Sequence, residues 1–259
     1  MFQKLLPGGN MKFRIIPTIL TNGTTVVKGT EFNNWRTVGS AEATARLFAA
    51  RDVDEIVFLD VEARKKGKSI DLDLVSKFSS LLRVPFAVGG GIDSLEVASR
   101  CLRNGAEKVI LGSSAYEKPE LISELSSIFG AQAVVVSIDI PNSDPNFIAI
   151  NSGKVLVKVK ALDYARKAQD LGAGEIILQS IDRDGLQKGY DLTLIQEFSE
   201  RLTIPIIASS GAGSVTNFAE AFHAGASGAA AGALFQFTEI TPMRARKELA
   251  LMGIPVRKT

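Results

Sequence analysis

The feature that most restricts the fold of this chain is an internal repeat with an offset of 120 residues. Three short motifs recur at this offset, each before or at the start of an apolar run: Glu55-Ile56 with Glu175-Ile176, Val84-Pro85-Phe86 with Ile204-Pro205-Ile206, and Asn104-Gly105-Ala106 with Ala224-Gly225-Ala226. A chance alternation of strands and helices would not hold one offset three times without a gap. The sequence therefore predicts two similar halves in one chain.

Apolar strand-like runs alternate with helical patterns along both halves, which indicates an α/β protein built from βα units around a parallel sheet. The predicted strands are Arg14–Leu20, Glu55–Asp60, Phe86–Gly89, Lys108–Leu111, Ala133–Asp139, Glu175–Ser180, Ile206–Ser209 and Gly228–Ala231. Helices are expected near residues 40–50, 71–82, 93–104, 118–129, 159–171, 191–201, 214–224 and 241–252. Eight such units in 259 residues fit a closed (β/α)8 barrel, or TIM barrel, made of two pseudo-symmetric half-barrels. A hairpin of Phe147–Ile150 and Val155–Val159 is expected after the fifth strand.

The domain organisation is expected to be one barrel over residues 11–259, preceded by a disordered extension or upstream start at residues 1–10. This opening segment is too short for a signal peptide, and no apolar run has membrane-spanning length, so no membrane association is expected. A lone cysteine, Cys101, cannot form an internal disulfide and predicts a reducing, cytoplasmic setting. A net charge of +2 with both signs interspersed gives no reason to expect a nucleic-acid partner.

Small residues follow four of the predicted strands at their carboxyl ends, where TIM barrels carry their active sites. They are Gly89-Gly90-Gly91 and Gly112-Ser113-Ser114 in the first half, and Ser209 to Gly213 and Gly232-Ala233 in the second. Backbone N–H groups exposed at such turns, next to a helix N-terminus, bind phosphate. One glycine-rich turn would be weak evidence, because a tight βα turn needs glycine in any case. Two pairs at equivalent positions predict a small-molecule ligand with a phosphate at each end, lying across the barrel mouth.

Three acidic positions at strand ends could transfer protons. Asp139 is the strongest candidate, because the alternation in Ser137-Ile138-Asp139 points its side chain into the barrel. Asp60 and Asp182 have an equally ordinary interpretation as residues that cap the following turn or helix.

Charged residues also stand near the starts of four predicted strands: Arg14, Glu55, Lys108 and Glu175. If they point inward, they form a ring of two bases and two acids across the barrel floor, and charges buried there must be paired. The ring is either a structural salt-bridge plug or a gate into the barrel, and spacing alone does not distinguish the two.

Other chemistry-bearing residues give little indication of function. His223 lies in a helical pattern away from the strand ends, and no His, Cys or Asp cluster has metal-ligand spacing, so neither a metal nor a cofactor is predicted. Trp35 and Arg36 follow the first strand and either cover a ligand or pack their own loop.

Several of these segments together resemble the cyclase subunit family of imidazole glycerol phosphate synthase, over essentially the whole chain from Arg14 onward. The matching segments are Arg14 to Pro17, Val26 to Gly29, Asp54 to Asp60, Val88 to Ile92, Gln132 to Asp139, Gly174-Glu175, and Ser180 to Gly185 with Gly189 to Asp191. The resemblance implies a cyclase that receives ammonia from a glutaminase subunit docked on the N-terminal face of its barrel.

The resemblance also implies roles for individual residues. Arg14, Glu55, Lys108 and Glu175 match the family's ammonia gate, which favours a gate over a plug. Lys28 matches a lysine that contacts substrate from a mobile loop. The two phosphate sites match residues in both halves: Gly91, Ser113, Asp184, Gly185, Gly211, Gly232 and Ala233.

One half of the family's acid and base pair is missing in this chain. Asp139 matches one of two catalytic aspartates, but Leu20 stands where the other should end the first strand, and leucine cannot move a proton. Gly112 and Ser210 are lesser departures, at positions where the family has Asn and Gly. A paralogous branch found with surface-polysaccharide genes also tends to carry leucine here. That branch is thought to deliver ammonia to a third enzyme, which converts a sugar acetamido group to an acetamidino group.

Three functions therefore follow as hypotheses. The first is an ammonia-delivering synthase subunit that no longer closes the imidazole ring. The second is a working cyclase of histidine biosynthesis, in which Asp139 or a displaced acid suffices. The third is a non-catalytic barrel that only binds and activates a glutaminase.

Overall fold

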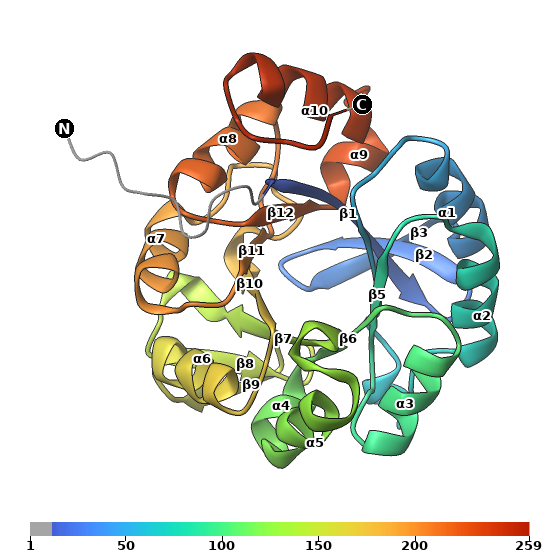
Figure 1. Cartoon of the computed structure of the whole chain (residues 1–259), viewed down its shortest axis with the longest axis vertical. Helices are drawn as coiled ribbons and strands as arrows, with labels where there is room; N and C mark the ends of the chain where they lie inside the picture. Colours follow the sequence, from blue (N-terminus) through green and yellow to red (C-terminus); the bar gives the residue numbers. More distant parts are fainter. Residues whose placement is uncertain (1–11, 259) are drawn as a thin grey trace.

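The computed structural model describes residues 12–258, so the extension expected at residues 1–10 lies outside the described part of the chain. Figure 1 shows a ring of helices around a central barrel of strands. The barrel strands are β1 (Arg14–Asn22), β4 (Ile56–Asp60), β5 (Phe86–Gly89), β6 (Lys108–Leu111), β7 (Val134–Ile140), β10 (Glu175–Ser180), β11 (Ile206–Ser209) and β12 (Gly228–Ala231). Neighbouring barrel strands all pair in parallel, and β10 pairs with β7 to close the ring. The predicted (β/α)8 barrel is confirmed.

The outer layer consists of helices that follow the barrel strands. They are α1 (Ala41–Ala49), α2 (Leu72–Leu81), α3 (Leu95–Arg103), α5 (Glu120–Phe129), α6 (Ala161–Asp170), α7 (Leu192–Arg201), α8 (Val215–His223) and α10 (Pro242–Leu251). Several begin at a residue whose side chain accepts a hydrogen bond from the first turn, including Ser40, Asp71, Ser94, Asp191 and Thr241. Such caps explain why these helices start within two residues of the predicted positions.

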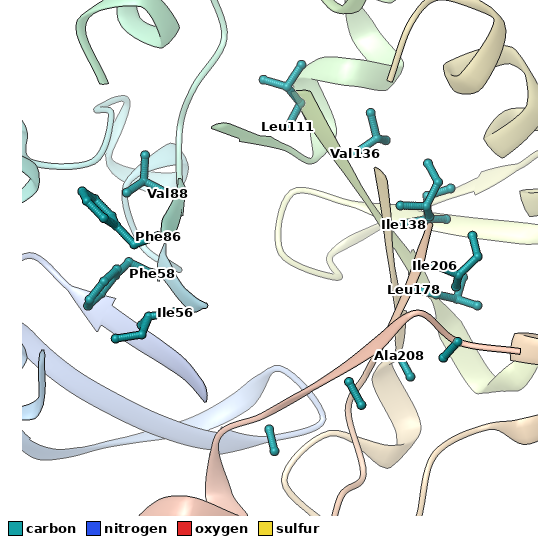
Figure 2. Close-up of a cluster of buried hydrophobic side chains, with 14 of the residues drawn as sticks. Ile56, Phe58, Phe86, Val88, Leu111, Val136, Ile138, Leu178, Ile206 and Ala208 are labelled. Carbon is teal, nitrogen blue, oxygen red and sulfur yellow. The ribbon is translucent and has the colours of Figure 1, made fainter. Parts of the chain in front are cut away.

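The main hydrophobic core lies between the strands and the helices. Alternate strand residues point outward into it, as Figure 2 shows for Phe58, Phe86 and Ile138. The ring of Phe58 stacks on that of Phe78 from α2, with 3.7 Å between ring centroids. The side chain of Cys101 is fully enclosed in this layer.

A second apolar cluster fills the inside of the barrel. One residue comes from each barrel strand: Ile16, Val57, Ala87, Ile110, Val135, Ile177, Ile207 and Ala230. These residues form a buried apolar layer across the barrel between its floor and its mouth.

The segment after β1 differs from the prediction. It forms an antiparallel hairpin of β2 (Thr25–Thr30) and β3 (Asn33–Ser40), not a loop. Lys28 therefore lies in a strand and is buried, which corrects its expected place on a mobile loop. The sequence pattern concealed β3, because its residues are almost all exposed and polar and show no alternation of apolar and polar side chains.

The remaining short elements decorate the two ends of the barrel. The hairpin predicted after the fifth barrel strand is confirmed as β8 (Phe147–Ile150) and β9 (Val155–Lys158). The helices α4 (Ser113–Glu117) and α9 (Ala233–Phe237) were not predicted, because five residues are too few for a recognisable period. Single turns of 3-10 helix are η1 (Arg64–Lys66), η2 (Ala131–Ala133), η3 (Pro141–Ser143) and η4 (Ile181–Arg183).

The C-terminal segment is attached beside the start of β1, where Phe13 and Val256 form a β-bridge. Arg246 of α10 is 1% exposed and donates to Asp54 at 2.8 Å and to Asp52 at 2.6 Å. Asp54 also accepts from the backbone N–H of Ile15 at 2.9 Å, so the segment is tied to the start of β1. Separately, no helix within residues 12–258 combines the length and the apolar character needed to cross a membrane.

Candidate functional site at the barrel mouth

A cavity opens at the carboxyl ends of the barrel strands, and every ligand or catalytic residue predicted there lines it. They are Lys28, Gly91, Ser113, Asp139, Asp184, Gly185, Gly211, Gly232 and Ala233. Leu20 is part of the same wall. Residues from both halves of the chain therefore meet in one cavity, as expected where parallel strands close into a barrel.

Asp139 points into this cavity from the end of β7. Its Oδ1 accepts hydrogen bonds from Gln179 Nε2 at 2.9 Å and from Ser137 Oγ at 3.2 Å. Gln179 is held in turn by Ser209, whose hydroxyl donates to Gln179 Oε1 at 3.2 Å. Burial raises the pKa of Asp139 to about 6, although the bonds from Gln179 and Ser137 act against this shift. A carboxyl group with such a pKa can take up and release a proton near neutral pH.

Leu20 occupies the corresponding place near the end of β1. Arg14, Ile16 and Thr18 alternate along this strand toward the barrel interior, and Leu20 continues the same series into the cavity. The wall that β1 contributes to the mouth is therefore apolar at position 20, whereas the wall from β7 carries Asp139.

Lys28 brings a buried amine into the second-half loops. Its Nζ donates to the carbonyl of Thr18 at 3.2 Å and lies so close to Gly232 that a Cβ at that position would be 2.1 Å from it. Burial lowers the pKa of Lys28 to about 8, and the charge of Asp184 partly offsets this effect. Burial also raises the pKa of Asp184, against the charge of Lys28.

The glycine loops predicted to bind phosphate share one feature in the two halves, a glycine with positive φ packed against a backbone carbonyl. Gly91 has a φ of +63°, and a Cβ there would lie 1.9 Å from the carbonyl oxygen of Lys68. Gly211, 120 positions later, has a φ of +111°, and a Cβ would lie 2.2 Å from the carbonyl oxygen of Gly189. Only glycine fits both the conformation and the space at these positions. In each half the next loop leads into a short helix, α4 after Gly112 and α9 after Gly232.

The four charged residues on the barrel floor do form a closed ring. Arg14 Nη1 lies 2.7 Å from Glu55 Oε2, and Arg14 Nη2 pairs with Glu175 Oε1. Lys108 Nζ lies 2.8 Å from Glu55 Oε1 and 3.0 Å from Glu175 Oε2. Burial lowers the pKa of Arg14, but the charges and hydrogen bonds of Glu175 and Glu55 outweigh it, and the pKa is raised overall. Each carboxylate thus bridges both cations beneath the apolar layer.

The other candidate acids have structural bonds. Asp60 accepts from the backbone N–H groups of Gly23, Glu62 and Ala63 at 2.9 to 3.0 Å, which fits the capping interpretation. Asp182 accepts from the N–H and the hydroxyl of Ser143, and so joins η4 to η3.

Trp35 and Arg36, which follow β1, were expected either to cover a ligand or to pack their own loop, and the structure gives them different contacts. Trp35 lines the cavity, whereas the guanidinium of Arg36 lies 4.7 Å from the ring centroid of Phe237 on α9. Arg36 therefore holds the hairpin against the barrel mouth, and Trp35 forms part of the cavity wall.

Sequence reasoning missed several polar residues of the cavity wall, among them Arg64, Ser137 and Gln179. Ser137 and Gln179 alternate inward along β7 and β10, so the strand period could have identified them. Arg64 had a different indication, because it lies 120 positions before Asp184. Within residues 12–258, no group of three or more His, Cys, Asp or Glu side chains is arranged to hold a metal ion.

The closed barrel and the polar cavity at its mouth define an α/β-barrel protein whose cavity lies at the end of the strands where such barrels carry their active sites. The model of the histidine biosynthesis protein family matches residues 14–241, and the chain belongs to this family.

The sequences of curated relatives align with this chain over almost their entire length. The chain is 40% identical to the imidazole glycerol phosphate synthase subunit HisF of Exiguobacterium sibiricum, over 94% of this chain and 98% of the relative. It is 40% identical to the protein of the same name from Thermococcus gammatolerans, over 94% and 97% of the two chains. The Thermobifida fusca relative is 38% identical over 96% of this chain and 100% of its own.

Proposed function

We propose that this chain is the synthase subunit of a glutamine amidotransferase of the imidazole glycerol phosphate synthase type. A glutaminase docks on the N-terminal face and supplies ammonia. The observation that carries the proposal is the order of layers along the barrel axis. The ion-pair ring of Arg14, Glu55, Lys108 and Glu175 lies at the floor, one apolar residue per strand lies above it, and Asp139 lies at the mouth. Ammonia passes the ring, crosses the apolar layer as the neutral molecule and meets a phosphorylated ligand beside Asp139.

The proposed ligand carries a phosphate at each end. Gly91 and Ser113 bind one phosphate, and Asp184-Gly185, Gly211 and Gly232-Ala233 surround the other, where Lys28 provides the positive charge. The support is that both sets line one cavity and that Gly91 and Gly211 each pack closely against a backbone carbonyl.

We further propose that the ammonia is passed on to another acceptor, because ring closure lacks its second acid. Leu20 cannot exchange a proton with a ligand that Asp139 faces from the other half of the barrel. The proposed acceptor is the substrate of a third, sugar-modifying enzyme that introduces an acetamidino group. The alternative is an active cyclase of histidine biosynthesis, which the names of the relatives favour.

The test is an assay of the purified chain with ammonium chloride and the two-phosphate substrate of imidazole glycerol phosphate synthase. We expect the substrate to bind, with turnover at least about 100-fold below that of a relative with both aspartates, since a positioned proton donor or acceptor contributes about 10²- to 10⁴-fold. Turnover equal to that of the relative would contradict this proposal and support the histidine cyclase. Absence of binding would favour a barrel that only activates its glutaminase.

Replacing Gly232 with alanine should separate ligand binding from stability. The added Cβ would lie 2.1 Å from Lys28 Nζ, at the flexible end of a side chain, so the amine moves and the fold remains. We expect about 10- to 100-fold weaker substrate binding, the range for one charge-assisted hydrogen bond, with an unchanged urea midpoint. Gly91→Ala is the contrasting variant, because its Cβ meets backbone at a φ of +63° and should lower the midpoint as well. Undiminished binding by Gly232→Ala would remove Lys28 from the proposed phosphate site.

A further inference from the structure

Arg64 lies in the cavity wall near the first-half phosphate loops, on the turn η1 that follows β4. Its Nε donates to Asn151 Oδ1 at 2.5 Å, and its Nη2 pairs with Glu117 Oε2 at 2.5 Å. Asn151 is the first residue of the β8–β9 turn, and its N–H donates to Ser113 Oγ at 2.8 Å. One guanidinium therefore connects the segments that follow β4, β6 and β7 around Ser113.

The segment that carries Arg64 also forms part of the first-half phosphate loop. The carbonyl of Lys68 lies where a Cβ of Gly91 would be, so this segment packs directly on the glycine. Ser113 accepts a hydrogen bond from Asn151 but keeps its hydroxyl proton, which is free to be donated to a ligand oxygen.

The two halves of the barrel differ in how they supply positive charge. At the second-half phosphate site the cation is Lys28, which comes from β2 in the first half of the chain and reaches Gly232. The strand that corresponds to β2 in the other half is β8, whose residues Phe147–Ile150 are all apolar, so the first-half phosphate site has no matching lysine. The residue 120 positions before Asp184 is Arg64, so the first half carries a cation where the second half carries an acid.

We propose that Arg64 is a binding residue for the ligand phosphate at the first-half site and does there what Lys28 does at the second. This inference rests on the proposed function, since it assigns a cation to one of its two phosphate sites. A guanidinium has five N–H donors, and the bonds to Asn151 and Glu117 use two of them. The remaining donors suit bidentate binding of a phosphate monoester held by the backbone of Gly91 and by Ser113.

Glu117 forms an ion pair with Arg64. Its side chain is 37% exposed and does not line the cavity, so it balances the charge of Arg64 from the outer side. The competing interpretation is that Arg64 only fastens the β8–β9 turn over the mouth through Asn151.

The experiment is a titration with inorganic phosphate, followed by NMR at the backbone amides of Gly91 and Gly211 in the full chain. The second amide is an internal control, since it reports the other site in the same sample. We expect Arg64→Ala to weaken binding at Gly91 by about tenfold or more and to leave binding at Gly211 within about twofold. Lys65→Ala removes the same charge from an exposed neighbouring residue that does not line the cavity, and should change neither site by more than about twofold.

Asn151→Gly distinguishes direct binding from fastening, because glycine accepts the φ of +54° at this position. It removes the bond to the hairpin turn and keeps the guanidinium, so binding at Gly91 should stay within about threefold of the parent chain. Equal losses in Arg64→Ala and Asn151→Gly, or an unchanged Gly91 site in Arg64→Ala, would overturn the inference while both phosphate sites stand. Absence of phosphate binding at Gly91 in the parent chain would overturn this site of the proposed function together with the inference.

Discussion

Replacing Leu20 with aspartate is expected to raise ammonium-driven ring closure by about 10²- to 10⁴-fold over the parent chain. The substitution places a carboxyl group on the wall that β1 contributes to the cavity, in the same mouth as Asp139. Position 20 is partly exposed to the cavity, so the new carboxylate is hydrated and does not need a buried partner. The measurement is the initial rate of imidazole product formation from the two-phosphate substrate in ammonium chloride.

Two features make this result specific to proton transfer. Leu20→Asn introduces a polar side chain of nearly the same shape as aspartate that cannot exchange a proton, and it should stay at the parent rate. The restored activity should also depend on Asp139, whose pKa is raised to about 6 by burial. Because a general base must be ionised, the rate should increase with pH through an acid limb near pH 6. Equal rates for the aspartate, asparagine and parent chains would show that a missing acid at position 20 does not limit ring closure.

Replacing Arg14 with methionine is expected to lower the free energy of unfolding by about 3 kcal/mol. Arg14 bridges Glu55 and Glu175, whose side chains are only 4% and 8% exposed, and its loss leaves two buried carboxylates facing the single charge of Lys108. Urea denaturation with an unchanged m-value would measure the effect. Arg46→Met is the matched control, because Arg46 forms an exposed pair with Glu42 on α1 and should cost less than about 1 kcal/mol.

A second substitution tests whether the loss comes from unpaired charge. Glu175→Gln in the Arg14→Met background removes one of the two carboxylates, so the double variant should regain part of the lost stability. A loss in Arg14→Met no larger than that in Arg46→Met would contradict the view that the ring is a tightly coupled network. If the ring is also the ammonia gate, Arg14→Met should impair glutamine-driven activity in the glutaminase complex more than ammonium-driven activity.

Much of the fold was predictable because it depends on local patterns. The eight barrel strands begin and end within two residues of their predicted positions, since short apolar runs between turn residues are a property of adjacent residues. The hairpin of β2 and β3 was not predictable in this way. Its second strand is exposed, and it is ordered by pairing with β2 and by the contact of Arg36 with Phe237, about 200 residues away in the sequence.

The residues of the candidate site likewise fall into those that local patterns predict and those that only the structure reveals. Asp139, the glycine loops and the floor charges were predicted, because the end of a barrel strand fixes which side chains enter the mouth or the floor. The repeat also indicated that equivalent loops of the two halves would face one barrel mouth, since a closed barrel brings all its strand ends together. The capping role of Asp60 and the joining role of Asp182 required the structure, because their partners lie on neighbouring loops.

By itself, the sequence determined the barrel, its two halves and the presence of Leu20 near the end of the first strand, because periodicity and residue identity are properties of the chain itself. Only the tertiary structure decided that Lys28 is buried against Gly232, that Gln179 holds Asp139, and that Arg64 joins Asn151 and Glu117 beside Ser113. These contacts join residues from 40 to more than 200 positions apart. Their geometry depends on how the closed barrel brings its loops together, and no local pattern of residues specifies it.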